Sequence, residues 1–443
     1  MNNTDFDRLV FETSFQLWSE RSALRDTRRR LKRYTYGDQW GDIVTDGDGR
    51  RVVESEWIKQ SGRKPITNNL IRRLVKTIVG RYRETAVNSG WYDTRPESFD
   101  SLRLLEELDS RLLEEFLISG MAIQRVADDN PLQGFEADVE NVNPDSFFCN
   151  DFRDPRGNDI DCIGMLHDMS PAEIMMRFGH GDGALTESLA RIIAKNRDMS
   201  IAAAGDTRFF NGAKGRIRVI EVWTREYSGE DILRWKVRWF TGAGELLDSY
   251  ESPWGHGCHP FVLKFYPLTD GEVHSFVEDV VDQQRYINRI IVLIDRILSV
   301  SAKGVLLFPL KQKPGSMSWE DVGRRWAAPD GVIPVNNANA AMPTQISGTS
   351  GDMSAYRLLE MELKLFDQTA GVGSALTGMS DNGNRAMGNE HYQAQVQNAT
   401  IALADIFRTF RSHITGRNVR LKSLTSKKQQ DEKHIYNQDK SDC

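Results

Sequence analysis

The chain has 443 residues, of which 40% are hydrophobic and 27% charged, a composition typical of folded globular proteins. Ten tryptophans and twenty phenylalanines argue against a disordered chain. The formal net charge of −6 argues against tight nucleic-acid binding over the whole surface, because an acidic protein repels a polyphosphate backbone.

The first predicted element is an amphipathic helix from Phe6 to Arg33. Aliphatic residues recur in it every seven positions and therefore lie on one stripe. They are Val10, Leu17, Leu24 and Leu31. The remaining surface carries the arginines Arg21, Arg25, Arg28, Arg29 and Arg30. We interpret these arginines as a solvated face, with a strip that contacts phosphate groups as the alternative.

The helix is expected to end in the patch YGDQW, residues 36–40. Gly37 suits the left-handed conformation that ends a helix, and the aromatic residues can pack over the last turn. A second helix is predicted after the segment PITNN (65–69), where an asparagine can cap the first turn. A third helix is predicted from Ser101 to Ile118, with Gly120 ending it.

The middle of the chain predicts mainly strands. Turn-forming residues alternate with short apolar pieces between Val139 and Met165, and Ser170-Pro171 begins a short helix. Four segments rich in β-branched and aromatic residues predict an antiparallel meander, with turns at 228–229 and 242–244. They are RIRVIEVWTREY (216–227), ILRWKVRWF (232–240), LLDSY (246–250) and FVLKFY (261–266). Trp235, Val237 and Trp239 alternate with basic residues, as in a half-buried strand.

The strongest helical signal runs from 276 to 302 and becomes apolar on several sides near Ile290. Such a helix must be covered on several sides, by a deep core or by neighbouring subunits. Residues 303–352 predict a small α/β insert with strands GVLLFPL (304–310) and GVIPV (331–335) around a short helix. A helix at 355–368, a glycine-rich mobile loop at 369–388 and a long helix at 389–412 follow.

No motif for catalysis or cofactor binding is present at a convincing spacing. Walker, HExxH and GxSxG patterns are missing, and the glycines at 179–183 indicate a plain turn. His256, Cys258 and His259 could ligate zinc, but no second ligand pair has finger spacing. The acid pairs Asp279/Asp282 and Asp151/Asp154 lack a companion base or metal set. We therefore predict no catalytic, cofactor-binding or metal site.

The chain also gives no sign of export or membrane insertion. Residues 1–5 lack the order of a signal peptide, and Asp295 interrupts the densest aliphatic run, 290–294. Four cysteines are scattered without CxxC spacing, which favours free thiols in a reducing compartment. They are Cys149, Cys162, Cys258 and Cys443.

The order of these pieces resembles the portal proteins of tailed bacteriophages, particularly those of short-tailed phages. Five segments between about residues 30 and 412 carry the resemblance. They are YGDQW (36–40), GRKPITNNLIRRLVKTIVGRYR (62–83), NPDSFFCNDFRDP (143–155), VEDVVDQQRYINRIIVLIDRIL (277–298) and GVGSALTGMSDNGNRAMGNEHYQAQVQNATIALADIFRTF (371–410). Each is degenerate alone, and their co-occurrence in this order is what makes the resemblance specific.

The resemblance implies an α+β portal fold that forms a ring, commonly of twelve subunits, around a channel for double-stranded DNA. Its parts would be the wing (1–275), first stem helix (276–302), clip (303–352), second stem helix (353–370), tunnel loop (371–388), returning wing helix (389–412) and a short basic and polar tail (413–443). A crown, which portals of this group usually carry, would be absent or minimal. Residues 417–428 of the tail could then meet packaged DNA.

The resemblance also assigns surfaces. Tyr36 and Trp40 would be packing residues at the corner where the first helix turns back onto the wing. The tunnel loop would face DNA with Gly378, Met379, Ser380, Asp381, Asn382, Asn384 and Arg385. The stem would contact neighbouring subunits through Ile287, Ile290, Ile291, Ile294 and Leu298. The clip would offer Lys311, Lys313, Arg324 and Arg325 to neighbouring subunits or tail adaptors, which we favour over DNA.

The expected function is a structural, non-enzymatic portal at one capsid vertex of the virion, assembled in the host cytoplasm. Its partners would be further copies of the chain, double-stranded DNA passing through the channel, the terminase large subunit, a head-tail adaptor and the major capsid protein. Two alternatives stay open. One is a metal-dependent nucleic-acid-processing enzyme that uses the acid pairs, and the other is a head-tail structural protein without a channel.

Overall fold

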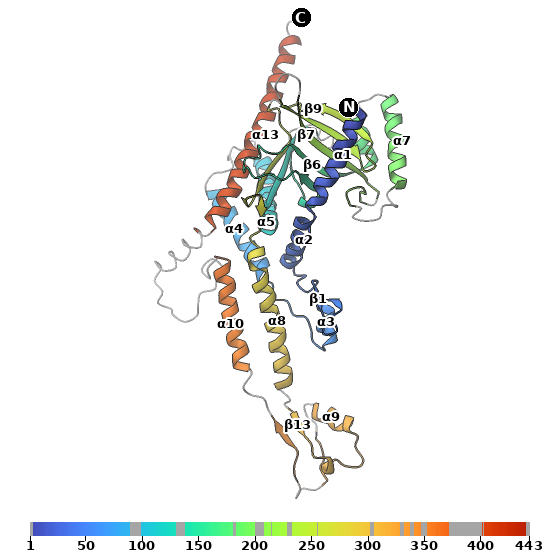
Figure 1. The fold of residues 1–443 in the computed structure, drawn as a ribbon. Coiled ribbons are helices and arrows are strands. Elements are labelled where there is room, and N and C mark those ends of the chain that lie inside the picture. Colours follow the sequence, from blue (N-terminus) through green and yellow to red (C-terminus); the bar gives the residue numbers. More distant parts are fainter. Residues whose placement is uncertain are drawn as a thin grey trace. The chain divides into compact units, whose positions relative to one another are not determined.

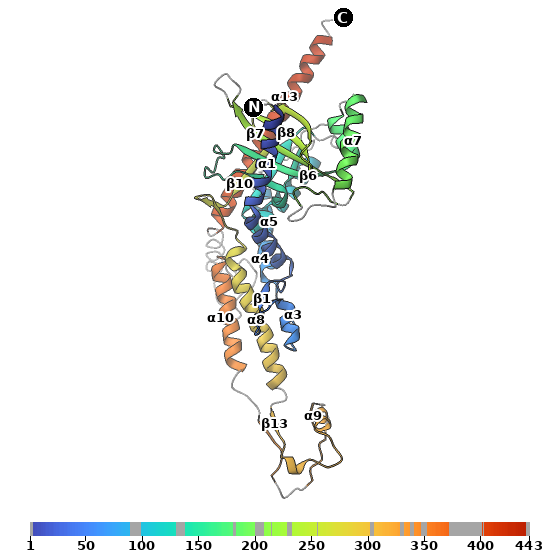
Figure 2. The same ribbon diagram turned by 45° about the vertical axis from the view of Figure 1, so that its right-hand side comes forward.

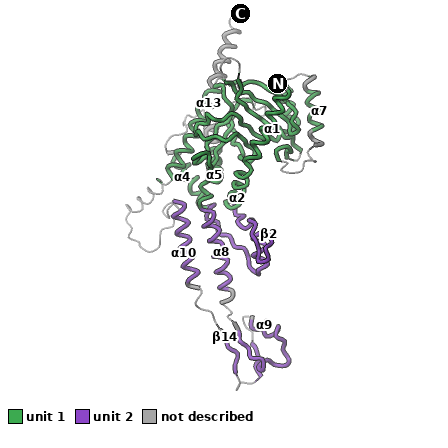
Figure 3. Tube along the Cα trace, in the orientation of Figure 1, with its two compact units in different colours: residues 1–35, 73–279, 374–443 green, residues 36–72, 280–373 purple. Residues whose placement is uncertain are grey.

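The computed structural model describes residues 3–88, 99–129, 138–179, 183–199, 208–213, 215–227, 233–254, 256–301, 305–327, 332–336, 341–346, 352–371, 401 and 403–439. The chain divides into two compact units (Figure 3). Unit 1 comprises residues 1–35, 73–279 and 374–443, and unit 2 comprises residues 36–72 and 280–373. In the part of the chain that is described, helices are too short or too polar to cross a membrane.

Unit 1 contains an antiparallel five-stranded sheet with the strand order β5-β6-β7-β8-β9 (Figure 1). Its strands are β5 (Phe147–Cys149), β6 (Cys162–Met169), β7 (Ile217–Tyr227), β8 (Leu233–Thr241) and β9 (Leu246–Glu251). The predicted strands at 216–227, 232–240 and 246–250 are thereby confirmed. So is the turn at 242–244, where the Thr241 N–H donates to the Glu245 carbonyl at 2.8 Å. The other predicted turn, at 228–229, lies outside the described residues.

The prediction that FVLKFY continues this meander is wrong. That segment forms β10 (Phe261–Phe265), which pairs with β3 (Met121–Ala127) in a second sheet of order β10-β3-β4, where β4 is Asp138–Asn141. Alternation of residue types marks a strand but does not name its partner. Short elements complete this part of unit 1: η3 (Pro144–Ser146), β11 (Pro267–Thr269) and β12 (Glu272–Val273).

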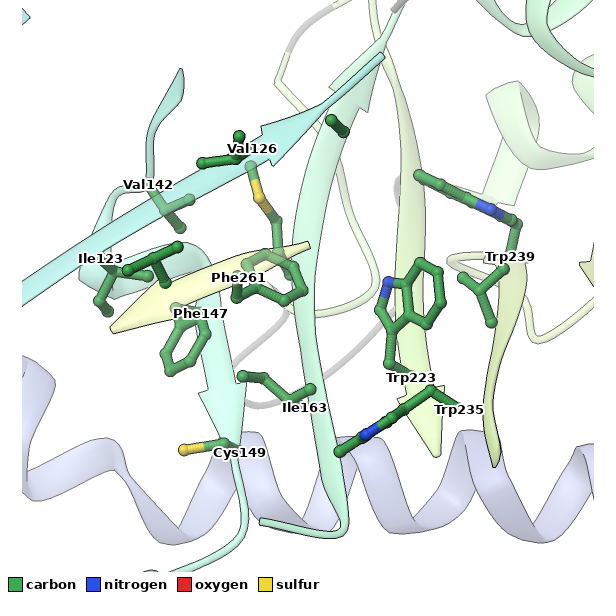
Figure 4. Close-up of a cluster of buried hydrophobic side chains, with 14 of the residues drawn as sticks. Ile123, Val126, Val142, Phe147, Cys149, Ile163, Trp223, Trp235, Trp239 and Phe261 are labelled. Atoms are coloured by element: carbon green, nitrogen blue, oxygen red, sulfur yellow. The ribbon is translucent and has the colours of Figure 1, made fainter. Parts of the chain in front are cut away.

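The core of unit 1 lies between the two sheets (Figure 4). Three alternate residues in the middle of β8 enter it, Trp235, Val237 and Trp239, as the sequence pattern predicted. Ile123 and Phe261 come from the second sheet. The alternation therefore identifies the residues of β8 that face this core.

The opposite face of the five-stranded sheet is also covered, by α1 (Asn3–Glu20) and Phe209. Val10 and Trp18 of α1 belong to one buried cluster there with Phe240 of β8. Arg238, expected on an exposed face, is 2% exposed and pairs with Asp7 at 2.6 Å. The strand is thus buried on both faces, because α1 supplies a cover that the strand's own pattern does not reveal.

The predicted amino-terminal helix is divided into α1 and α2 (Ser22–Tyr36). Its arginines are not a solvated face, because Arg25 and Arg28 are 2% and 4% exposed. The Arg25 guanidinium lies 3.7 Å from the ring centroid of Trp18, and Arg28 forms an ion pair with Glu115 at 2.6 Å. The helix ends as predicted at Gly37, whose φ is 101°.

The remaining helices of unit 1 include the carboxyl-terminal α13 (Ala404–Asp439), which contacts β3 and β10. The others are α4 (Leu70–Asn88, in unit 1 from residue 73), α5 (Phe99–Ser119), α6 (Pro171–Phe178) and α7 (Gly183–Met199). The helix predicted at 389–412 differs from α13, which continues 27 residues past Ser412. Residues 389–400 lie outside the described part of the chain.

The start of α6 confirms the predicted Ser170-Pro171 signal. The Ser170 hydroxyl accepts from the Glu173 N–H at 3.2 Å, and the Glu173 side chain accepts in return from the Ser170 N–H. Ser170→Ala is expected to destabilise α6 by about 1 kcal/mol, because the cap is lost. Hydrogen exchange of the α6 amides checks this, with Ser316→Ala, at an exposed serine of the other unit, as the control.

Unit 2 contains a helix pair and two smaller groups of elements. The pair is α8 (Glu278–Ser301, in unit 2 from residue 280) and α10 (Asp352–Thr369), close to the predicted helices. The first group is β1 (Ile43–Thr45), β2 (Arg51–Val53) and α3 (Glu54–Gln60), all three unpredicted. The second is β13 (Val305–Leu307), η4 (Leu310–Gln312), α9 (Trp319–Ala327) and β14 (Thr344–Ile346). The strand predicted at 331–335 is wrong, because β13 pairs with β14 instead.

Candidate assembly and partner surfaces

Helices α8 and α10 lie side by side (Figures 1 and 2). Ile290 and Ile294 of α8 pack against Ala355 of α10, with Ile297, Leu358 and Leu359 at the edge of the contact. Ile290 and Ile294 are 3% and 8% exposed, and Ile287 is fully buried. The sequence left open whether a deep core or neighbouring subunits cover Ile290 and Ile294, and α10 of the same chain supplies this cover.

The helix pair nevertheless keeps large apolar side chains on its surface. Leu298, one of the residues predicted at the subunit interface, is 47% exposed, and Ile291 is half-buried. The other exposed side chains are Tyr286 and Leu293 on α8, and Tyr356, Met361 and Leu365 on α10. Apolar surface of this extent on a helix pair is typical of a protein interface.

The second feature of unit 2 is a segment that we call the clasp, residues 36–72. Its Trp40 is 6% exposed, packs with Ile58 and Val292, and donates its indole N–H to the Thr67 hydroxyl at 3.0 Å. Trp40 is therefore a packing residue, as predicted. Tyr36 is not, since its ring is 54% exposed beneath the Arg72 guanidinium. Trp40 also packs against Val292 of α8, a contact that the prediction did not name.

Two buried amides of α8 bind the backbone of the clasp. The Gln284 carbonyl oxygen accepts from the N–H groups of Leu70 and Ile71 at 2.8 and 3.2 Å. The Gln284 amide donates to the Asn68 carbonyl at 2.7 Å, and the Asn288 oxygen accepts from the Asn68 N–H at 3.0 Å. These bonds satisfy groups at the start of α4 that have no partner within that helix. The Asn69 side chain caps α4 as predicted, accepting from the Arg72 N–H at 3.0 Å.

The clasp also places a buried carboxylate and a buried amide against α8. Glu54 is 1% exposed and accepts hydrogen bonds from Arg285 at 2.8 Å and from Arg289 at 2.8 and 2.5 Å. Gln39, also 1% exposed, accepts from the Asn288 amide at 2.5 Å. Charge-assisted bonds to two arginines stabilise a carboxylate that burial would otherwise disfavour.

The sequence did not predict this polar contact between the clasp and α8. The available signal was a stripe of polar residues spaced by four on a helix that is otherwise apolar, at 284, 285, 288 and 289. Polar residues at such positions face either solvent or a polar partner, and the pattern alone does not distinguish the two. Their partners lie more than 200 residues away in the chain.

The insert between α8 and α10 displays basic and apolar residues. Of the predicted partner surface, Lys311, Arg324 and Arg325 are exposed. Lys313 is half-buried, donates to the Met317 carbonyl and lies 5.6 Å from the Trp319 ring centroid, so it stabilises the insert itself. Leu307, Leu310, Val332 and Met342 are exposed apolar residues of the same insert. At the start of α9, hydrogen bonds from the side chain and N–H of Ser318 lower the pKa of Asp321.

A family model described as the phage P22-like portal protein matches residues 105–416. That range covers more than half of the chain and includes the five-stranded sheet, most of α5, all of α8 and α10, and the insert between them. The chain belongs to this portal family. A search of curated proteins returned no match. The clasp precedes the matched range.

Membership of the portal family confirms the resemblance seen in the sequence. The tunnel-loop residues predicted to face DNA, Gly378 to Arg385, lie outside the described residues. Their role therefore stays a prediction. The part of the family match that the structure describes is a mixed α/β arrangement, which agrees with the predicted α+β class.

The acid pairs of the enzyme alternative have local structural roles or lie on the surface. Asp154 accepts from the Arg156 N–H and from the Asn158 amide, both at 2.9 Å, and hydrogen bonds from Arg156 lower its pKa to about 2. Asp151 is exposed and lies 3.4 Å from Arg21. Asp279 and Asp282 are exposed on α8.

The two histidines near Cys258 make hydrogen bonds and ring contacts with other residues of the chain. His259 is 7% exposed, packs edge-on against Trp235 and accepts from the Phe261 N–H at 3.2 Å. Burial and the nearby Arg420 lower its pKa well below the usual range. The His256 Nδ1 atom accepts from the Cys258 N–H at 3.1 Å. Within the described ranges, three or more potential metal ligands do not gather at one place.

The hypothesis that the basic tail meets packaged DNA is wrong for its first residues. Arg417 is fully buried and forms an ion pair with Asp109 at 2.8 Å, and Asp109 is fully buried too. Arg420 donates to the carbonyls of His259 and Phe261 at 2.6 Å each. These arginines attach α13 to the core of unit 1, so they are not available to phosphate groups.

Proposed function

We propose that the chain assembles into a ring that forms the portal at one vertex of a tailed-phage capsid and conducts double-stranded DNA during packaging and ejection. The observation that carries the proposal is the family match over residues 105–416. In this assignment α8 and α10 are the stem helices, the insert between them is the clip, residues 371–388 are the tunnel loop, and most of unit 1 is the wing. The ring has twelve subunits, the number common in portals.

The surface of unit 2 supports self-association. Most of the exposed large apolar side chains in the described ranges belong to this unit, which holds less than a third of the chain. On α8, Tyr286 and Leu293 are seven residues apart and lie on one line along the helix. Neighbouring copies around an axis would cover this line, because each subunit of a closed ring contacts two others.

The charge of the chain suits a conduit that does not retain DNA. A ring of subunits with net charge −6 repels a duplex over most of its surface, so contact is confined to a few residues such as Arg385 in the tunnel loop. The role is structural. ATP hydrolysis belongs to the terminase motor, which docks on the clip during packaging and is later replaced by a head-tail adaptor. The major capsid protein surrounds the ring in the virion.

Ring formation is the experiment that tests this function. Purified protein is expected to form rings with an axial pore in negative-stain micrographs, and mass photometry gives the concentration dependence. Leu293→Asp should raise the concentration needed for assembly by roughly tenfold or more, because each subunit loses apolar burial at its interface. Leu9→Asp, at a 47% exposed leucine of unit 1, is the control and should assemble normally. A protein that stays monomeric at every concentration contradicts the proposal.

A further inference from the structure

The clasp and α10 contact different sides of α8. The clasp meets Gln284, Arg285, Asn288, Arg289 and Val292. Helix α10 meets Ile290, Ile294 and Ile297. Successive residues of a helix are about 100° apart around its axis, so these two sets occupy separate sides. Tyr286 and Leu293 lie between them and are exposed.

The two contacts constrain α8 differently. Packing of Ile290 and Ile294 on α10 is apolar, and apolar contact is not directional. Hydrogen bonds are directional, and buried polar groups are costly without a partner. Rotation of α8 about its axis would separate Gln284 from three backbone groups at residues 68–71 and Glu54 from Arg285 and Arg289. The clasp is therefore the contact that fixes the rotation of α8.

The rotation of α8 about its axis matters because it sets the direction in which the exposed Tyr286 and Leu293 face a neighbouring copy. Rings of twelve and thirteen subunits differ by only roughly 2° in the angle between neighbours, so a small change in the interface changes closure. We propose that the clasp is a positioning element: the contacts that its Glu54, its Gln39 and its backbone make with α8, including those with Gln284 and Asn288, hold the line of Tyr286 and Leu293 at one angle toward the neighbouring copy. They thereby set the subunit number. This inference rests on the proposed function. The clasp lies outside the family match.

Glu54→Gln is the variant that tests the inference. It keeps the shape of the side chain and removes the charge that binds Arg285 and Arg289. Glu56→Gln, on the exposed side of the same helix α3, is the matched control. Native mass spectrometry and class averages of top views are expected to show one ring size for the wild type and for Glu56→Gln, and more than one size for Glu54→Gln. A single wild-type size for Glu54→Gln overturns the inference, even if that variant melts at a lower temperature.

A charge-reversed triple variant separates positioning from simple loss of stability. Glu54→Arg alone places three positive charges together and should give mixed or open assemblies. Glu54→Arg combined with Arg285→Glu and Arg289→Glu restores opposite charges and should restore the single ring size. Failure of the triple variant to narrow the distribution counts against the inference.

The same contact can be measured without assembly. Under conditions that keep the chain monomeric, Glu54→Gln is expected to increase hydrogen exchange in α8 at residues 284–292 by roughly tenfold, and Glu56→Gln to leave it unchanged. Unchanged exchange in Glu54→Gln overturns the inference. Wild-type protein that never forms rings contradicts the proposed function instead, because the exchange measurement does not depend on rings.

Discussion

Replacing Asp109 by asparagine is expected to destabilise unit 1 by about 3–5 kcal/mol, because the substitution leaves the buried Arg417 guanidinium without its counter-charge. Both side chains are fully buried, and their oxygen and nitrogen atoms lie 2.8 Å apart. The pair joins α5 to α13. Urea unfolding measures the loss, and hydrogen exchange of α13 should show that this helix is released first.

Two comparisons make this result specific. Glu107→Gln removes an exposed partner of Arg111 on the same helix and should cost less than about 1 kcal/mol. The double variant Asp109→Leu with Arg417→Met replaces the ion pair by apolar side chains of similar size and should be more stable than either single change. Equal stability of Asp109→Asn and the wild type would show that α13 does not depend on this pair.

Helices α8 and α10 of unit 2 were predictable from the sequence, but the way they are covered was not. Apolar residues at 287, 290, 291 and 294 predict a helix, because their spacing matches its period. The same spacing does not say whether the cover is α10 or another chain. Ile290 and Ile294 turned out to contact Ala355 of the same chain. The cover comes from α10, which follows in the chain about 60 residues later.

Buried charged residues were the least predictable class. The sequence predicts four arginines to be exposed, because arginine is rarely buried without a partner. They are Arg25, Arg28, Arg238 and Arg417. Each is buried beside a carboxylate or an aromatic ring from another element. A single sequence contains no pattern that pairs residues as distant as Asp7 and Arg238. The clasp was missed for the same reason, because Glu54 acquires its role only from Arg285 and Arg289.

A second buried cluster joins the two sheets of unit 1. Glu221 of β7 is fully buried and accepts from Arg125 of β3 at 3.0 Å and from the Trp223 indole at 2.8 Å. The His167 ring nitrogen lies 2.8 Å from the same carboxylate. Arg125 also binds Asp129, which binds Arg177. Burial favours the neutral form of Glu221, but Arg125 and His167 outweigh it and hold the pKa of Glu221 well below its usual range.

Glu221→Gln is therefore expected to destabilise unit 1 by about 3 kcal/mol or more at pH 7 and to flatten its acid sensitivity. A carboxyl whose pKa is lower in the folded chain contributes stability above its unfolded pKa of about 4.3 and loses that contribution as pH falls toward the folded value. The pKa of Asp129 is lowered as well, since Arg125 outweighs its burial, so wild-type stability should fall steeply below about pH 5. Denaturant unfolding between pH 3 and pH 7, with Glu251→Gln at an exposed position of β9 as the control, measures both effects. The mutant and wild-type curves should converge as pH falls below about 4.3, because the unfolded wild-type chain then binds a proton at Glu221 that the folded chain does not, and the wild type loses that part of its stability. Parallel curves at all pH values would show that Glu221 is not the group that couples the fold to acid.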